Sequence, residues 1–75
     1  MSRLEIRSEV TGNVWKVEVA VGDHVDAEDA LLILESMKME IPVETPCAGV
    51  VSELLVKEED AVEEGQVVVI IEADT

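Results

Sequence analysis

The stretch GNVWKVEVAVGDHVDAEDALLILE, residues 12–35, determines the fold because the chain repeats its pattern 37 residues later. The second copy is GVVSELLVKEEDAVEEGQVVVIIE, residues 49–72, and the two copies align without a gap. A unit this short cannot bury an apolar face alone, so the repeat predicts two similar halves that pack on each other. Identical residues occupy seven aligned pairs: Gly12 and Gly49, Val14 and Val51, Val19 and Val56, Asp23 and Asp60, Val25 and Val62, Ile33 and Ile70, and Glu35 and Glu72.

The apolar residues follow the period of β-strands, and no segment predicts a helix. Two continuous apolar runs, residues 30–35 and 66–72, predict strands buried on both faces or nearly so. Val19 and Val56 are expected to point into the core. The predicted strands are residues 3–10, 13–21, 30–35, 39–45, 49–57 and 66–72.

Two of these strands contain local irregularities. Val14 and Val17 are three residues apart, which breaks the period of two and predicts a β-bulge near Trp15 or Lys16. We expect Trp15 to pack at the rim of the sandwich. Pro42 has no amide hydrogen to donate, so its strand is predicted to lie at a sheet edge or to bulge there.

The composition fits an all-β protein. The 75 residues include 14 Val and 5 Ile but one Trp and no Phe or Tyr, which favours pleated strands and argues against an aromatic ligand cage or a base-stacking platform. We predict a single domain over residues 1–75, folded as a flattened antiparallel β-barrel or sandwich of two pseudo-twofold halves.

The charge is strongly negative, with 18 acidic against 5 basic residues and a formal net charge of −13. Nucleic acids and anionic lipids bind clustered Lys and Arg, so neither is an expected partner. One cysteine, Cys47, allows no internal disulfide. We see no signal peptide and no membrane-spanning run, and we expect a cytoplasmic monomer.

Lys38 lies at the midpoint of the chain, within the segment ILESMKMEIPVET, residues 33–45. The strand that ends near Glu35 and the strand that begins near Met39 leave only three residues between them. That length predicts a tight hairpin. Lys38 is then expected to project from the hairpin tip, with the chain termini at the opposite end of the molecule.

The segment ESMKMEIPV resembles the attachment signature of biotinyl domains, in which a lysine between two methionines is acylated by biotin. GNVWKVEVAVGDHV before it and PCAGVVSELLVKEEDAVEEGQVVVIIE after it are also similar to that family, so the resemblance extends from about Val10 to Glu72. The chain most resembles stand-alone biotin/lipoyl attachment proteins of the biotin carboxyl carrier type. The resemblance implies a barrel-sandwich hybrid with Lys38 on a β-hairpin tip.

The resemblance also implies a carrier rather than an enzyme. A biotin protein ligase would acylate Lys38, and the biotin arm would move carboxyl groups between a biotin carboxylase and a carboxyltransferase. The second hypothesis is a lipoyl carrier, although lipoyl domains typically place Asp and Ala around the lysine where this chain has Met37 and Met39. The third is an unmodified lipoyl-like module that binds other proteins.

The residues beside Lys38 would serve recognition of that lysine. Met37 and Met39 would offer a soft exposed surface to the ligase and the carboxylase. Glu40 would steer a basic partner surface, and Ser36 would supply turn chemistry. Glu35 is as consistent with a structural role, because its copy in the second half has no lysine nearby.

The remaining candidates indicate neither a catalytic residue nor a metal site. His24 lies among acidic residues, but the spacing is that of an acidic turn and its copy is alanine. We interpret Cys47 as a small residue at the start of a strand. A reactive thiol is the alternative interpretation. The chain departs from the family at two turns, where Glu28 and Glu59 occur, and the copy of each is glycine.

Overall fold

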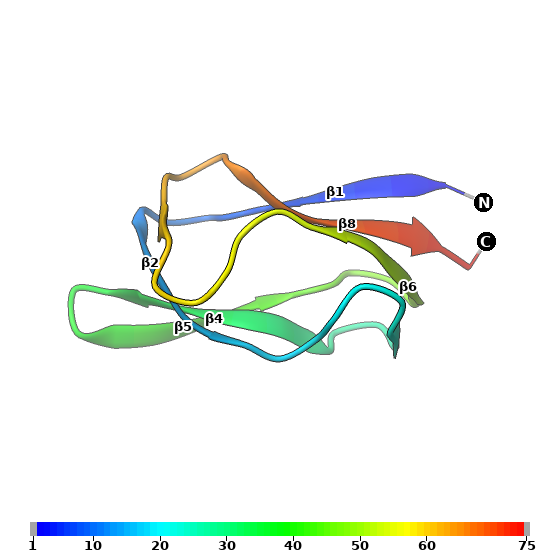
Figure 1. Cartoon of the computed structure of the whole chain (residues 1–75), viewed down its shortest axis with the longest axis horizontal. Coiled ribbons are helices and arrows are strands. Elements are labelled where there is room, and N and C mark those ends of the chain that lie inside the picture. The colour runs from blue at the N-terminus through cyan, green and yellow to red at the C-terminus, as the bar shows by residue number, and fades with distance from the viewer. Residues whose placement is uncertain (1, 75) are drawn as a thin grey trace.

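The fold consists of eight β-strands in a computed structural model that describes residues 2–74. Those residues form no helix, and hence none that is long and apolar enough to cross a membrane. Figure 1 shows the strands in two layers, with both termini at one end and the β4–β5 hairpin at the other. The strands are β1 (Arg3–Arg7), β2 (Gly12–Val17), β3 (His24–Val25), β4 (Ala30–Ser36), β5 (Met39–Glu44), β6 (Gly49–Leu54), β7 (Ala61–Val62) and β8 (Val67–Ala73).

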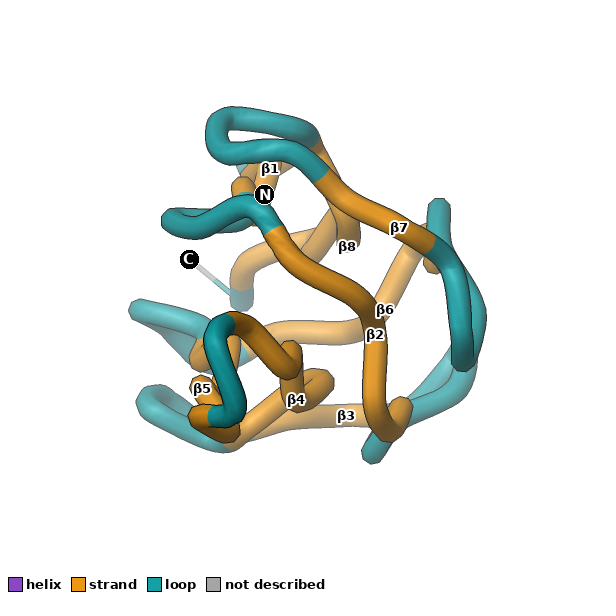
Figure 2. Tube along the Cα trace, turned by 90° about the vertical axis from the view of Figure 1, so that its left-hand side faces the viewer, coloured by secondary structure: helices purple, strands orange, loops and turns teal. Residues whose placement is uncertain are grey.

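Two four-stranded antiparallel sheets form the layers, in the orders β1-β8-β6-β3 and β5-β4-β2-β7. A shift of 37 residues converts β2, β3 and β4 into β6, β7 and β8. The same operation relates β1 to β5 and exchanges the two sheets, which confirms the predicted pseudo-twofold arrangement. Figure 2 shows β7 beside the layer of β1 and β8, and β3 beside the layer of β4 and β5, so the sandwich closes towards a flattened barrel.

The core lies between the sheets and consists of aliphatic side chains from both halves. β4 and β8 contribute most, because each is an inner strand built from a continuous apolar run. The prediction of two buried runs is confirmed, although Ile33 is only half-buried where its copy Ile70 is buried. Val56 is buried as expected, and Val19 packs against the core as expected, although it is only half-buried. The fully buried side chains of β4 and β8 are Leu31, Leu32, Leu34, Val68, Val69 and Ile71.

The first strand is shorter than the apolar alternation predicted. It ends at Arg7 instead of Val10, because buried Ser8 interrupts it. The Ser8 hydroxyl donates a hydrogen bond to the carbonyl of Val10 and accepts one from the amide of the same residue. Thr45 makes the same two bonds to Cys47 at the aligned position in the second half. A hydroxyl that bonds nearby backbone groups competes with the sheet ladder and ends the strand.

The strands predicted at residues 13–21 and 49–57 also end early, as β2 and β6. In each half an aspartate turns the chain. The carboxylate of Asp23 accepts a hydrogen bond from the amide three residues before it at 2.9 Å, and that of Asp60 does the same at 3.0 Å. The predicted boundaries of the other three long strands differ from the structure by one residue at each altered end.

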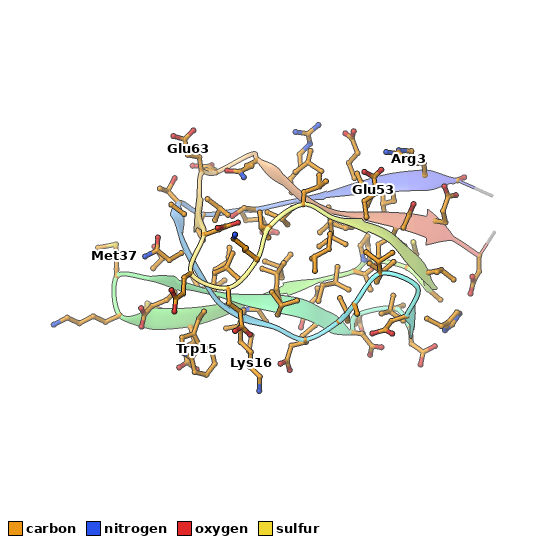
Figure 3. The ribbon with its side chains drawn as sticks, viewed as in Figure 1. Arg3, Trp15, Lys16, Met37, Glu53 and Glu63 are labelled. Atoms are coloured by element: carbon orange, nitrogen blue, oxygen red, sulfur yellow. The ribbon has the colours of Figure 1, made fainter. Side chains whose placement is uncertain are left out.

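Both predicted irregularities are confirmed. The β2–β4 register shifts between Val14 and Lys16, which places the bulge at Trp15. Pro42 lies in β5, an edge strand. The expected packing of Trp15 at the rim is wrong. Figure 3 shows the Trp15 side chain projecting outward into solvent from the β5-β4-β2-β7 sheet, and this side chain is 49% exposed.

Four turn residues adopt left-handed backbone conformations at aligned positions. Gly22 has a φ of 96° and its copy Glu59 a φ of 76°, whereas Glu28 has a φ of 72° and its copy Gly65 a φ of 88°. The two glutamates that depart from the family pattern therefore keep the turn geometry of their glycine copies.

Candidate functional site

The hairpin between β4 and β5 is a two-residue turn. Ser36 pairs with Met39 in the ladder, so only Met37 and Lys38 lie between the strands. Both have positive φ, 52° and 67° respectively, as in the type I′ turn, whose twist matches that of the flanking strands. The predicted tight hairpin is confirmed, and it lies opposite the chain termini (Figure 1).

This turn holds two residues with side chains where glycine or asparagine is preferred. A Cβ in the left-handed region costs about 1–2 kcal/mol per residue. Met37 and Lys38 remain there because the β4–β5 ladder, which pairs six positions on each strand, over-determines the turn. The strained backbone fixes the direction in which the lysine leaves the chain.

The base of the hairpin is attached to the segment that precedes β2. The Ser36 hydroxyl donates a hydrogen bond to the carbonyl of Thr11 at 2.9 Å, and the Thr11 hydroxyl accepts one from the amide of Glu64 at 3.1 Å. Gly12 packs directly against the carbonyl of Glu35, so closely that a Cβ on the glycine would overlap that oxygen. The turn is therefore the free end of an anchored hairpin.

The side chains of the turn are open to solvent. Met37 is 92% exposed and Met39 is 63% exposed, so the expected exposure of these two side chains is confirmed. Figure 3 shows the Met37 side chain at the tip, pointing away from the sheets. Lys38 is exposed and takes part in none of the ion pairs found among residues 2–74. Its amine is therefore open to solvent.

Two acidic residues face each other at the base of the turn. Glu35 lies directly opposite Glu40 in the β4–β5 ladder, and both are exposed. At the aligned place near the termini, Arg3 lies opposite Glu72. Opposite charges stabilise such cross-strand pairs and like charges destabilise them. The hairpin end thus has two like charges directly opposite each other, where the terminal end has two opposite charges.

His24 and Cys47 lie outside the hairpin. The Nε2 atom of His24 is 2.9 Å from an Oδ atom of Asp74, and this hydrogen bond, with the negative charge of the same carboxylate, raises the pKa of His24. Cys47 is half-buried in the segment before β6. Within residues 2–74, no group of three or more His, Cys, Asp or Glu side chains is arranged to hold a metal ion.

Comparison with known proteins identifies the family. The family profile described as "Biotin-requiring enzyme" matches residues 5–74. The chain belongs to this biotin/lipoyl attachment family. The biotin/lipoyl attachment protein of Bacillus subtilis is 44% identical to the attachment domain over 64 residues, which cover 85% of this chain and 88% of the relative. The biotinylated protein TB7.3 homolog of Mycobacterium leprae is 40% identical over 67 residues, which cover 89% of this chain and 94% of the relative.

A solved structure shares the fold. The urea carboxylase of Kluyveromyces lactis superimposes with a TM-score of 0.90 and 42% identity over 96% of this chain. The matched region is 6% of that enzyme, so the attachment domain corresponds to one small part of it. This likeness confirms the predicted all-β sandwich.

The six residues that sequence analysis associated with the site are consecutive in the attachment domain, and the hairpin brings them to one end. Sequence reasoning missed two residues that fix this hairpin, Thr11 and Gly12. Gly12 had a signal, since it is identical to Gly49 in the repeat and both glycines pack against a backbone carbonyl. Thr11 had none, because its role depends on two contacts that are distant in the sequence.

Proposed function

We propose that this attachment domain is a biotin carrier and that biotin is attached to the Nζ atom of Lys38. The observation that carries the proposal is the type I′ turn, which presents an exposed lysine at the tip of an anchored hairpin. The names of the two relatives support it, since one is called a biotin/lipoyl attachment protein and the other a biotinylated protein.

The chemistry of attachment is acyl transfer to an amine. A lysine amine is ordinarily protonated in neutral water, so a biotin protein ligase must remove a proton and supply an activated acyl group such as biotinyl-adenylate. The nitrogen attacks the acyl carbon, an amide bond forms, and the bond from that carbon to the adenylate oxygen breaks. Met37 and Met39 would contact the ligase, and the Glu35–Glu40 pair would attract its basic surface.

The attached group would supply a carrier for activated carboxyl groups. The attachment domain would move it between a biotin carboxylase and a carboxyltransferase, as partners in a biotin-dependent carboxylase. The contribution of the protein is position and effective concentration rather than bond making. We propose that residues 1–75 act as one monomeric domain in this role.

Lipoate is the second candidate for Lys38. The name of the Bacillus subtilis relative covers both groups. The Met-Lys-Met sequence favours biotin over lipoate by resemblance to biotinyl domains. A lipoyl carrier would have the same hairpin but would serve a different class of enzyme.

The test is the intact mass of the protein after incubation with a biotin ligase, biotin and ATP, followed by peptide mapping. We expect one biotinyl increment on Lys38. The Lys38→Arg variant should lose it and keep its stability within about 0.5 kcal/mol, because the side chain is exposed. Lys16→Arg and Lys57→Arg are the matched controls and should still be labelled. A lipoyl increment in cells, or labelling that survives Lys38→Arg, would refute the proposal.

A further inference from the structure

A pocket lies on the side of the sandwich where β1 and β5 are the edge strands. Its volume is about 160 Å³. Its apolar surface comes from Val10 in the segment after β1 and from Ile41 and Pro42 in β5, with buried Leu34 and Val43 behind them. A single water occupies about 30 Å³, and drug-sized sites begin at roughly 300 Å³, so this pocket fits a group of one or two small rings.

Charged groups border the same pocket. Arg7 is held there by hydrogen bonds to the carbonyl of Gly65 at 2.8 Å and to the carboxylate of Glu5 at 2.9 Å. A guanidinium has five N–H groups, so further donors remain. Glu9 and Glu44 also line the pocket, and their carboxylates take part in no ion pair among residues 2–74. The pocket therefore offers one cationic donor and two anionic acceptors around an apolar wall.

The pocket lies within reach of the hairpin tip. Leu34 and Ile41 form a ladder pair, and Ile41 is three residues along β5 from Lys38. A strand advances about 3.4 Å per residue, so this separation is about 10 Å. Eleven bonds join the lysine Cα to the ring of a biotinyl group, which gives an arm of about 14 Å at ordinary bond lengths. A fully extended arm therefore brings the ring to the Ile41 end of the pocket, whereas Glu44 is six residues from Lys38, or about 20 Å, at the far end.

The chemistry of the ring matches the pocket. A ureido group has one carbonyl, which can accept from Arg7, and two N–H groups, which can donate to Glu9 and Glu44. The fused sulfur ring is apolar and suits the aliphatic wall. A lipoyl dithiolane ring has no N–H donor, so it could not make the two hydrogen bonds to Glu9 and Glu44.

We propose that the pocket between β1 and β5 is a resting site for the ureido ring of the biotinyl group carried on Lys38. The proposal rests on the proposed function, because it requires biotin on that lysine. Weak intrinsic binding is sufficient, since a short tether gives an effective concentration in the millimolar range, or about 1 mM. Docking would cover the ring between encounters with partner enzymes.

The first test compares the amide NMR shifts of the unmodified and the fully biotinylated protein, with modification verified by intact mass. We expect shifts at Val10, Leu34 and Ile41 in addition to those at the turn. Shifts confined to residues 37–39 in a protein that mass analysis shows to be biotinylated would overturn the docking site and leave the proposed function intact. Failure to biotinylate Lys38 would overturn both.

The second test measures how fast streptavidin captures the biotinylated protein, because capture requires the undocked ring. Val10→Phe fills the pocket, and we expect capture to accelerate roughly two-fold or more as the docked fraction falls. The matched control is Cys47→Phe, which introduces the same residue at the aligned position in the second half and should leave the rate unchanged.

Two further variants keep this test decisive if Val10→Phe does not fold. Glu9→Gln and Glu44→Gln change exposed residues without altering their size, and each should accelerate capture and reduce the shifts at Leu34 and Ile41. Wild-type rates and shifts in both glutamine variants, or an equal acceleration in Cys47→Phe and Val10→Phe, would overturn the proposal.

Discussion

The two halves of the attachment domain meet the same backbone requirement with different residues. The turn before β3 has Gly22, whereas its copy before β7 has Glu59. The turn before β4 has Glu28, whereas its copy before β8 has Gly65. All four residues have positive φ. The left-handed conformation therefore belongs to the fold, and the residue adapts to it.

A second pair of positions allows no such exchange. Gly12 and Gly49 are glycine in both halves, and each packs against the backbone carbonyl of a neighbouring strand. A Cβ at Gly22 or Gly65 would meet no atom within 4 Å. A left-handed turn with open space tolerates a side chain at a conformational cost, whereas a close backbone approach excludes one. The two halves therefore differ in residue type at the open left-handed turns and both keep glycine at the close backbone approaches.

The largest effect is expected from a methyl group at the close approach. Gly12→Ala and Gly49→Ala should each lower the free energy of unfolding by about 4 kcal/mol, because the new Cβ must displace a paired strand. Urea denaturation would measure the loss. Gly65→Ala is the matched control and should lose about 1 kcal/mol, from its φ alone. A similar loss in all three variants would remove the distinction between the two kinds of glycine.

The second effect tests the unequal burial of one aligned pair. Val56→Asp should destabilise the domain by about 3 kcal/mol, because it buries an unpaired carboxylate. Val19→Asp should cost about 1 kcal/mol, since half-buried Val19 lets the new charge reach water. The melting temperatures of the Val56→Asp and Val19→Asp variants would measure this difference. Val21→Asp is the exposed control, and equal melting temperatures for Val56→Asp and Val21→Asp would contradict the assigned core.

A stabilising change is predicted at the two glutamates. Glu28→Gly and Glu59→Gly should each raise the free energy of unfolding by about 0.5–1 kcal/mol. Glycine removes the steric cost of a Cβ in the left-handed conformation. This gain is partly offset by the greater entropy of glycine in the unfolded chain. Urea midpoints would measure the gain. Glu28→Gln keeps the Cβ and removes the charge, so an equal gain in that variant would attribute the effect to charge repulsion instead.

The smallest effect concerns a pair present in one half only. His24 contacts Asp74, whereas the copy of His24 is Ala61. The hydrogen bond and charge of Asp74 raise the pKa of His24 in the folded state. The contribution to stability is therefore full below the ordinary histidine pKa of about 6.5 and disappears as the pH rises through the raised value. The melting temperatures of wild type and Asp74→Asn should differ more near pH 5.5, about one unit below the ordinary histidine pKa, than near pH 8, about 1.5 units above it. A constant difference would contradict the pair.

The sequence predicted the architecture because the repeat, the valine alternation and Pro42 each constrain the strands directly. The bulge at Trp15 followed from the spacing of Val14 and Val17 in the same way. The strand ends at Ser8 and Thr45 were missed, since a hydroxyl that bonds local backbone leaves no trace in an apolar pattern.

The hairpin site was predictable in place but not in geometry. The position of Lys38 between the two halves indicated a tight turn. Positive φ at a methionine and a lysine could not be predicted, because neither residue favours it and the ladder on either side imposes it. The pocket beside β5 also had no signal, since its residues meet only when the two edge strands come together.

The pairing of β1 with β8 has a consequence for how this fold can be combined with other proteins. Arg3 lies opposite Glu72, and the amide of Ala73 donates to the carbonyl of Ser2 at 2.7 Å, so the chain enters and leaves at neighbouring points. The molecule is 36 Å long, and the tip with Lys38 is at its other end. A host protein can therefore accept the whole unit at a single surface loop, and neither junction obstructs the lysine.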